Sequence, residues 1–169
     1  VNGGFDGRFA ETGGMVAEVG ANIALITYPG DEQTAAMRLA RIGSDNVIGY
    51  LTVGTDGAFP VELTDLVLPA PRVSVAELDR LRAEYAVTVI DIRNPGERDV
   101  GTIPGAVHIP LAQLRTQCAE IPAGKPIVVH CAGGWRSSVA ASMMRADGFA
   151  NVSDLIGGYT AWKQAQDAV

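Results

Sequence analysis

Apolar and polar positions follow one another along the chain in the order of short strands and longer helices. Short apolar runs, typical of buried strands, occur at residues 23–27, 86–92 and 126–130. The first and third runs lead through a glycine-containing turn into stretches with helical spacing, at 32–42 and 137–146. Strands that alternate with helices predict an α/β fold with a mainly parallel central sheet flanked by helices.

The two strand–turn–helix blocks read as an internal repeat. Each helix ends near a glycine, the expected terminator, at Gly43 and Gly148, and an asparagine–valine pair follows in both. The alignment places Tyr28 where the second block has Cys131. The first block lacks an opening strand and helix, so we expect residues 1–55 to be a truncated, degenerate copy. The proline-containing segment 56–72 reads as a linker, and residues 73–169 as the complete domain.

The complete domain places a cysteine where α/β proteins build their sites. Residues 74–77, Ser-Val-Ala-Glu, form a capping-box pattern that predicts the start of a helix. The nearly continuous apolar run 86–92 suits a central strand covered on both faces. Further short helices are expected from Leu111 and over 160–168. Ligands bind beyond the carboxyl ends of strands in such sheets, and Cys131 stands directly after one of them.

The loop after Cys131 has the composition of an anion cradle. Its N–H groups and the N-terminus of the following helix are expected to point at the sulfur and to favour the reactive thiolate. The same groups can hold the terminal sulfur of a persulfide anion. Gly133 and Gly134 allow the backbone to curl tightly there. Arg136 is expected to pair with an anionic donor, and Ser137 or Ser138 to cap the helix.

Four motifs in this order resemble the rhodanese homology domain: Asp91-Ile92-Arg93, residues 101–110, the Cys131 loop and residues 157–162. The resemblance covers roughly residues 73–162 and implies a sulfurtransferase without metal or other cofactor. It implies that thiosulfate or a thiol persulfide donates a sulfane sulfur to Cys131, and that a thiol or cyanide accepts it. The substrate-binding set implied beside this nucleophile is Ala132, Gly133, Gly134, Trp135, Arg136 and Ser137, with Asp91 and Arg93 as an ion pair that supports the loop.

Two positions depart from the family pattern. Thr102 stands where the family commonly has a histidine, and Ala132 where it often has an arginine directly after the cysteine. The missing cation predicts weaker thiosulfate binding and favours a bulkier thiol persulfide. Trp135 would give such a donor an apolar wall.

The order of a degenerate copy and a complete one resembles the C-terminal tandem rhodanese part of metallo-β-lactamase-fold hydrolase fusions. That resemblance implies a hydrolase or persulfide dioxygenase domain upstream, and it keeps open a non-catalytic regulatory or interaction module as the alternative function. A phosphatase is disfavoured because four residues separate Cys131 from Arg136, whereas the phosphatase pattern has five.

The composition excludes some classes of binding partner and indicates a cellular location. Thirteen basic and nineteen acidic side chains give a formal net charge of −6, without charged blocks, which argues against nucleic-acid and anionic-membrane partners. No apolar stretch approaches the roughly 20 residues of a membrane span. Two cysteines fit a reducing cytoplasm, and Cys118 is expected to be incidental. His108 and His130 are expected to be hydrogen-bonded packing residues rather than metal ligands or general bases.

Overall fold

The computed structural model describes residues 7–67, 69–118, 121 and 124–168, which divide into two compact units. The first unit extends to Pro69 and the second begins at Ala70. Residues 1–6 of the predicted first copy, residue 68 of the predicted linker, and residues 119, 120, 122, 123 and 169 of the predicted second copy lie outside the described residues.

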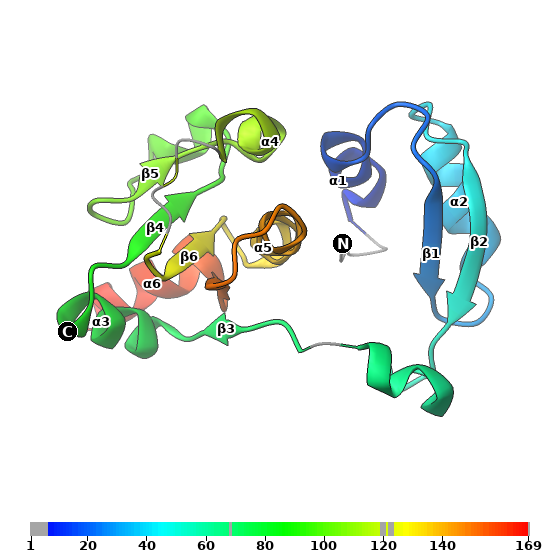
Figure 1. Ribbon diagram of the computed structural model, residues 1–169. Coiled ribbons are helices and arrows are strands. Elements are labelled where there is room, and N and C mark those ends of the chain that lie inside the picture. Colours follow the sequence, from blue (N-terminus) through cyan, green and yellow to red (C-terminus); the bar gives the residue numbers. More distant parts are fainter. Residues whose placement is uncertain (1–6, 68, 119–120, 122–123, 169) are drawn as a thin grey trace. The chain divides into compact units, whose positions relative to one another are not determined.

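The first unit is a small strand–helix–strand layer preceded by a helix (Figure 1). Its two strands pair in parallel, from Ile23 opposite Val47 to Thr27 opposite Thr52. A small core of Leu25, Ala35 and Leu39 joins the sheet to the helix between the strands. Its elements are α1 (Phe9–Val16), β1 (Ile23–Thr27), α2 (Glu32–Ala40), β2 (Val47–Thr52) and the 3-10 helix η1 (Val61–Leu66), which lies within the predicted linker.

The two units differ in one respect that bears on the predicted repeat. Leu25 of β1 packs against α2, the helix that follows it. The repeat aligns Leu25 with Val128, yet Val128 packs against residues of α3 and α6 rather than the helix that follows its own strand. Strand side chains alternate between faces, so the two strands are out of phase by one residue in this alignment. The division into a degenerate copy, a linker and a complete copy stays a prediction.

The second unit confirms the predicted α/β fold with a parallel central sheet. Its five strands have the order β3-β7-β6-β4-β5, and every pairing is parallel. Its strands are β3 (Arg72–Val73), β4 (Thr88–Asp91), β5 (Val107–His108), β6 (Ile127–His130) and β7 (Val152–Leu155). Its helices are α3 (Val75–Glu84), η2 (Pro95–Arg98), η3 (Leu111–Gln113), α4 (Leu114–Gln117), α5 (Trp135–Ala146) and α6 (Gly158–Asp167).

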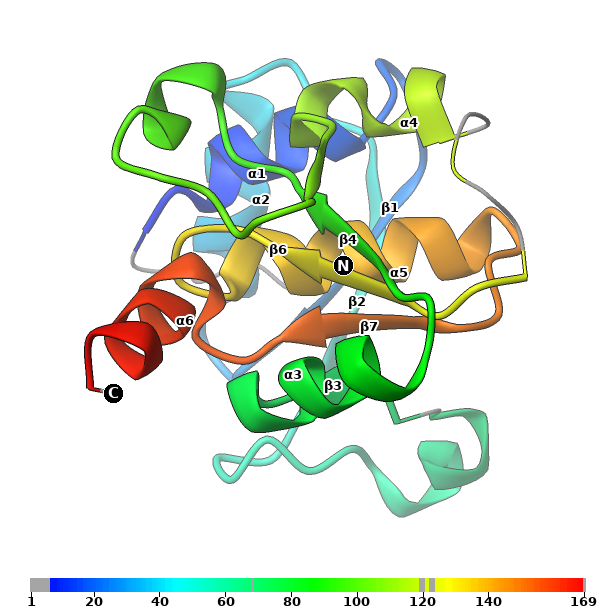
Figure 2. The same cartoon turned by 90° about the vertical axis from the view of Figure 1, so that its left-hand side faces the viewer.

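Helices cover both faces of this sheet, which explains the continuous apolar runs of its central strands. All four residues of β6 are buried. Helices α3 and α6 lie on one face and α5 on the other (Figures 1 and 2). On the first face Leu78, Val128 and Tyr159 share one apolar cluster. The predicted capping box starts α3: Ser74 accepts from the Glu77 N–H, and the Glu77 carboxylate accepts from the Ser74 N–H.

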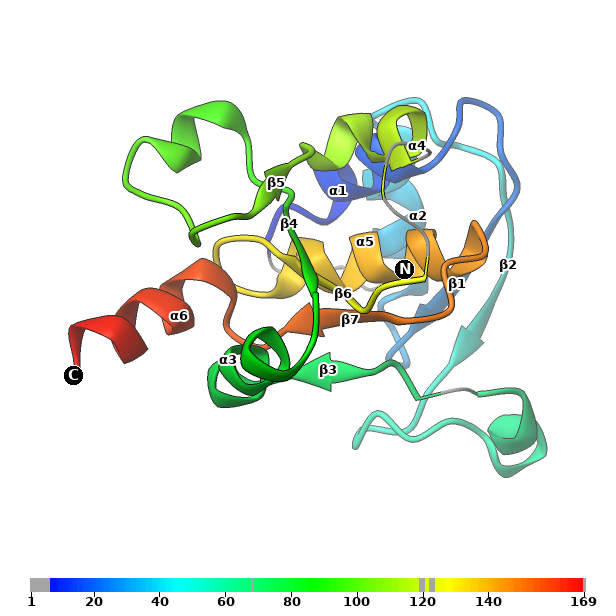
Figure 3. The ribbon, with the colours of Figure 1, turned by 60° about the vertical axis from the view of Figure 1, so that its left-hand side comes forward.

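The loops after β4 and β6 and the start of α6 gather at the carboxyl end of the sheet (Figure 3). This arrangement follows from parallel pairing, because all carboxyl ends then lie along one edge. Among the described residues, no helix is both long and apolar enough to cross a membrane.

Candidate active site

Cys131 lies at the carboxyl end of β6, directly before a tight loop that starts α5. Its side chain is buried, with 2% of the residue exposed. The Gly134 N–H donates a hydrogen bond to the Cys131 Sγ at 3.1 Å, and the Ser137 Oγ lies 3.7 Å from the same sulfur. The sulfur therefore faces the N-terminus of α5, where unpaired N–H groups and the helix dipole favour a negative charge.

The start of α5 differs from the prediction. The helix begins at Trp135, two residues before the predicted start, and its N-cap is Gly134 with no side-chain cap. The expectation that a serine caps the helix is wrong: Ser137 is buried beside the sulfur, and the Ser138 hydroxyl donates to the Trp135 carbonyl. Gly134 adopts φ +96°, a left-handed conformation in which only glycine is unstrained.

The N-terminus of α6 is hydrogen-bonded to the backbone of the Cys131 loop. The N–H groups of Tyr159 and Thr160 donate to the carbonyls of Cys131 and Ala132, at 2.8 and 3.0 Å. Gly158 makes this close approach possible, because a Cβ atom there would lie 2.5 Å from the Cys131 carbonyl oxygen. The glycine pair before Tyr159 thus lets two elements distant in the sequence fix the backbone that carries the sulfur.

Arg136 is already paired. Its two terminal nitrogens lie 2.7 and 2.5 Å from the Glu97 carboxylate oxygens, in a bidentate ion pair. These hydrogen bonds hold the pKa of Glu97 below its usual value. The charge of Arg136 is therefore compensated within the protein, and its pairing with an anionic donor stays a prediction.

A buried ion pair lies beneath the loop. The Arg93 guanidinium donates to both oxygens of Asp91, with a shortest distance of 2.7 Å, and both residues are almost fully buried. Burial is the largest single influence on Asp91 and raises its pKa, but the hydrogen bonds from Arg93 and the nearby positive charge together outweigh burial and hold the pKa of Asp91 below its usual range. Arg93 also donates to the carbonyls of Glu97 and Gly101 and lies over the Tyr159 ring, 4.2 Å from its centroid. The predicted pair thus joins the sheet, the loop after β4 and α6.

His130 is buried without a full set of hydrogen bonds. Its Nδ1 lies 3.3 Å from the Cys131 carbonyl oxygen, but its Nε2 has no hydrogen-bond partner among the described residues. Burial lowers the pKa of His130, and the Asp91 carboxylate, 3.8 Å from Nε2, offsets this only in part. The ring is therefore neutral near pH 7, and the expectation of a fully hydrogen-bonded histidine is wrong here. His108 does find a partner, because its Nε2 lies 2.8 Å from the Arg93 carbonyl oxygen.

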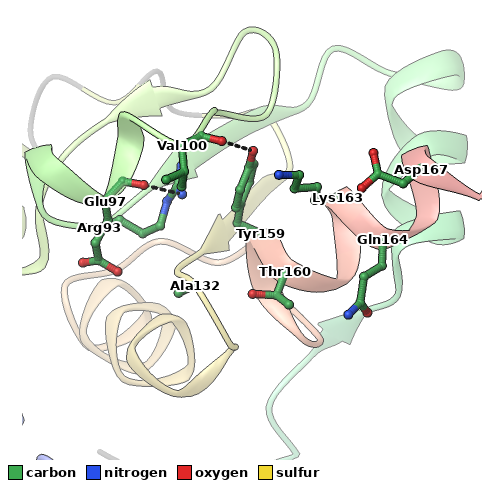
Figure 4. A pocket seen from close by; sticks show the side chains of 9 residues that line it. All are labelled: Arg93, Glu97, Val100, Ala132, Tyr159, Thr160, Lys163, Gln164 and Asp167. Carbon is green, nitrogen blue, oxygen red and sulfur yellow. Dashed lines mark hydrogen bonds between the residues drawn. The ribbon is translucent and has the colours of Figure 1, made fainter.

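A pocket of about 410 Å³ opens beside the loop, between the segment after β4 and α6 (Figure 4). Of the residues predicted to bind substrate, only Ala132 lines it, and the predicted supporting residue Arg93 lines it too. Trp135 does not line it and is 61% exposed at the surface. The full lining is Arg93, Glu97, Val100, Ala132, Tyr159, Thr160, Lys163, Gln164 and Asp167.

Sequence reasoning missed two charged residues of this region. Glu97 stands three residues after Asn94, a capping pattern that accounts for its contact with the Asn94 N–H but gives no sign of Arg136. Lys163 has a helical position with no motif of its own. The sequence indicates a role for Lys163 only through its helical spacing from Thr160 and Asp167, which puts the three polar side chains on one face of α6.

The comparison with protein-family models decides the family: the model of the rhodanese-like domain matches residues 74–165. The chain belongs to the rhodanese family. A sulfurtransferase of Allochromatium vinosum is 35% identical over 49% of this rhodanese chain and 78% of its own. The human thiosulfate:glutathione sulfurtransferase is 31% identical, over 57% of this chain and 96% of its own.

Solved structures show the same rhodanese-like fold. The crystal structure of a rhodanese-related protein from Thermoplasma volcanium is 30% identical, with a TM-score of 0.52. The similarity covers 56% of this chain and 92% of that one. The parallel sheet and its flanking helices are thus those of the rhodanese-like fold that the family match indicates. Sulfurtransferases are among the relatives.

Proposed function

We propose that this chain is a sulfurtransferase that carries a sulfane sulfur as a persulfide on Cys131. The observation that supports it best is the position of the Cys131 Sγ at the end of β6, where it accepts the Gly134 N–H at 3.1 Å at the start of α5. An N–H that donates to the thiol sulfur can donate equally to an anionic sulfur, and the helix N-terminus favours that charge. Sulfurtransferases among the rhodanese relatives support the same reaction class.

The proposed reaction has two displacements at sulfur. The Cys131 thiolate attacks the sulfane sulfur of a donor, a new S–S bond forms, and the bond between that sulfur and the rest of the donor breaks. Sulfite leaves from thiosulfate, or a thiolate leaves from a thiol persulfide. A thiolate or cyanide then attacks the outer sulfur and Cys131 leaves as thiolate, so the enzyme returns to its initial state after a ping-pong cycle.

Within this proposal, the residues of the Cys131 loop differ in how directly they act. The N–H of Gly134 contacts the sulfur, and the Ser137 hydroxyl lies within reach of the outer sulfur's charge. Ala132 and Gly133 complete the loop, and Trp135 supplies an exposed apolar side chain at its end. Asp91 and Arg93 are positioning residues, because their ion pair lies beneath the loop.

The donor is proposed to be a thiol persulfide more readily than thiosulfate. Ala132 brings no cation, and Glu97 compensates the charge of Arg136, so a small dianion finds little net positive charge next to Cys131. The human relative is a thiosulfate:glutathione sulfurtransferase, which supports testing both kinds of small molecule.

The alternative is a non-catalytic rhodanese-like module that regulates a metallo-β-lactamase-fold hydrolase or persulfide dioxygenase encoded upstream. That fusion, the cytoplasmic location and the degenerate first copy stay predictions from the sequence. The Glu97 carboxylate on Arg136 argues against a phosphatase, because a phosphate would need that guanidinium free.

The test is intact mass and peptide mapping of the reduced protein after incubation with thiosulfate or, separately, glutathione persulfide. We expect one added sulfur atom on Cys131 that a thiol removes, and none in the variant Cys131→Ser. Cys118→Ser is the matched control and should load normally, because Cys118 caps the end of α4, outside the Cys131 loop, and its thiol donates to the Arg115 carbonyl. A folded wild-type protein that takes up no sulfur from either donor would leave the interaction module as the better description.

A further inference from the structure

Helix α6 turns one polar stripe toward the pocket beside Cys131. Thr160, Lys163, Gln164 and Asp167 all line the pocket, and their spacing of i, i+3, i+4 and i+7 puts them on one face of the helix. Trp162 lies on the opposite side of the helix and packs against the apolar core, while Tyr159, between the two sides, belongs to that core and also lines the pocket. The pocket is therefore bounded by the polar face of α6.

The charges on this stripe are free, unlike the other charges around the pocket. Arg93 is paired with Asp91, and Glu97 is paired with Arg136. In the part of the chain that the structure describes, Lys163 and Asp167 form no ion pair. The pocket thus offers one ammonium group and one carboxylate to a ligand, next to the neutral walls of Val100 and Tyr159.

The polar stripe begins next to the Cys131 loop and runs away from it along α6. The Thr160 N–H donates to the carbonyl of Ala132, the residue after Cys131, so the near end of the stripe adjoins the loop. From Thr160 to Asp167 the helix rises by about 10 Å, at about 1.5 Å per residue. In Figure 4, Lys163 extends toward Tyr159, while Gln164 and Asp167 lie at the end remote from Ala132. A ligand that uses both ends must therefore be about as long as three extended residues, which also span about 10 Å.

We propose that this α6 face is a recognition site for a zwitterionic, peptide-sized thiol, as sulfur donor or acceptor. The thiol sulfur would enter beside Ala132, a carboxylate would bind Lys163, and an ammonium group would bind Asp167. The inference rests on the proposed function, since it assigns the organic part of the molecule that exchanges sulfur with Cys131. A pocket of 410 Å³ has the size of sites for small organic ligands and far exceeds what thiosulfate would fill.

The experiment measures binding without sulfur chemistry. The probe is S-methylglutathione, a peptide thioether that keeps its ammonium and carboxylate groups but cannot transfer sulfur, and its diethyl ester lacks the carboxylate charges. Binding to the full chain is followed by amide chemical shifts in NMR titrations. We expect wild-type protein to bind the acid several-fold more tightly than the ester, with the largest shifts in α6 and at Ala132.

The variant Lys163→Gln should weaken binding of the acid by about 3–10-fold, the range of one partly exposed charged hydrogen bond, and should leave the ester unchanged. Asp167→Asn should weaken both ligands, because both keep the ammonium group. The chain's other lysine gives a matched control: Lys125 is exposed and does not line the pocket, so Lys125→Gln should bind like the wild type.

The outcomes separate this inference from the proposed function. If Cys131 takes up sulfur but Lys163→Gln and Lys125→Gln bind the acid equally, the recognition site is wrong and the sulfurtransferase stands. If the acid binds on α6 with the expected dependence on Lys163 but Cys131 never takes up sulfur, the site stands as a peptide-thiol receptor and the sulfurtransferase is wrong. Shifts confined to residues outside α6 and the Cys131 loop would also overturn the inference.

Discussion

The substitution Gly158→Ala tests whether α6 fixes the backbone that carries Cys131. The residue has φ +57°, and an added Cβ would lie 2.5 Å from the Cys131 carbonyl oxygen and 2.7 Å from that of Ala132. Atoms do not tolerate such distances, so the start of α6 must move away from the loop. That movement breaks or stretches the two hydrogen bonds from Tyr159 and Thr160 to these carbonyls.

The expected loss of stability is the sum of two effects. An alanine in the left-handed region costs about 1–2 kcal/mol by itself. Two hydrogen bonds lost from the carbonyls of the loop cost about 1 kcal/mol each. Gly158→Ala should therefore lower the free energy of unfolding by about 3–4 kcal/mol. Gly148→Ala provides the matched control, because Gly148 has φ +94° with no atom within 4 Å of its Cβ position, so only the conformational cost applies.

Urea unfolding followed by tryptophan fluorescence measures this difference, because both tryptophans, Trp135 and Trp162, lie in the rhodanese unit. The displaced loop should also slow the loading of Cys131 with sulfur in Gly158→Ala but not in Gly148→Ala. Equal losses of stability in the two variants, with equal loading rates, would refute the idea that close contact between α6 and the loop is needed.

Two further predictions concern charge near the site. Because burial depresses the pKa of His130, the unfolded chain binds a proton there first as the pH falls. His130 therefore costs stability below about pH 6.5, with a slope of up to about 1.4 kcal/mol per pH unit that continues down to its depressed pKa. The free energy of unfolding, measured with urea at several pH values between 7 and 5, should depend less on pH in His130→Gln than in the wild type. In His108→Gln its pH dependence should be unchanged, and equal pH dependence in both variants would contradict the assignment. Glu97→Gln removes the carboxylate from Arg136 and, at about 1 kcal/mol for one charge in a partly screened site, should lower the KM for thiosulfate by about 5-fold. A KM that is unchanged or higher would show that Glu97 does not compete with anionic donors.

The sequence alone determined the fold class and the position of Cys131 at the end of a central strand. The apolar run before Cys131 became the fully buried strand β6, and the Ser74–Glu77 pattern became the capping box of α3. Gly134 takes the left-handed conformation that a tight loop requires. These features could be predicted because each depends on neighbouring residues, whose periodicity and conformational preferences are written in the chain.

Only the tertiary structure decided which groups meet around the sulfur. Arg136 is bound by Glu97, 39 residues earlier in the chain, which changes it from a free cation into half of an ion pair. Helix α6 donates two hydrogen bonds to the backbone of the Cys131 loop and places Lys163 in the lining of a pocket that no sequence motif predicted. Within the described part of the chain, burial also leaves the His130 Nε2 without a hydrogen-bond partner, which its sequence neighbours do not reveal. A charged or polar side chain takes its partner from whatever the fold brings within about 3 Å, and that choice depends on the packing of distant elements rather than on local pattern.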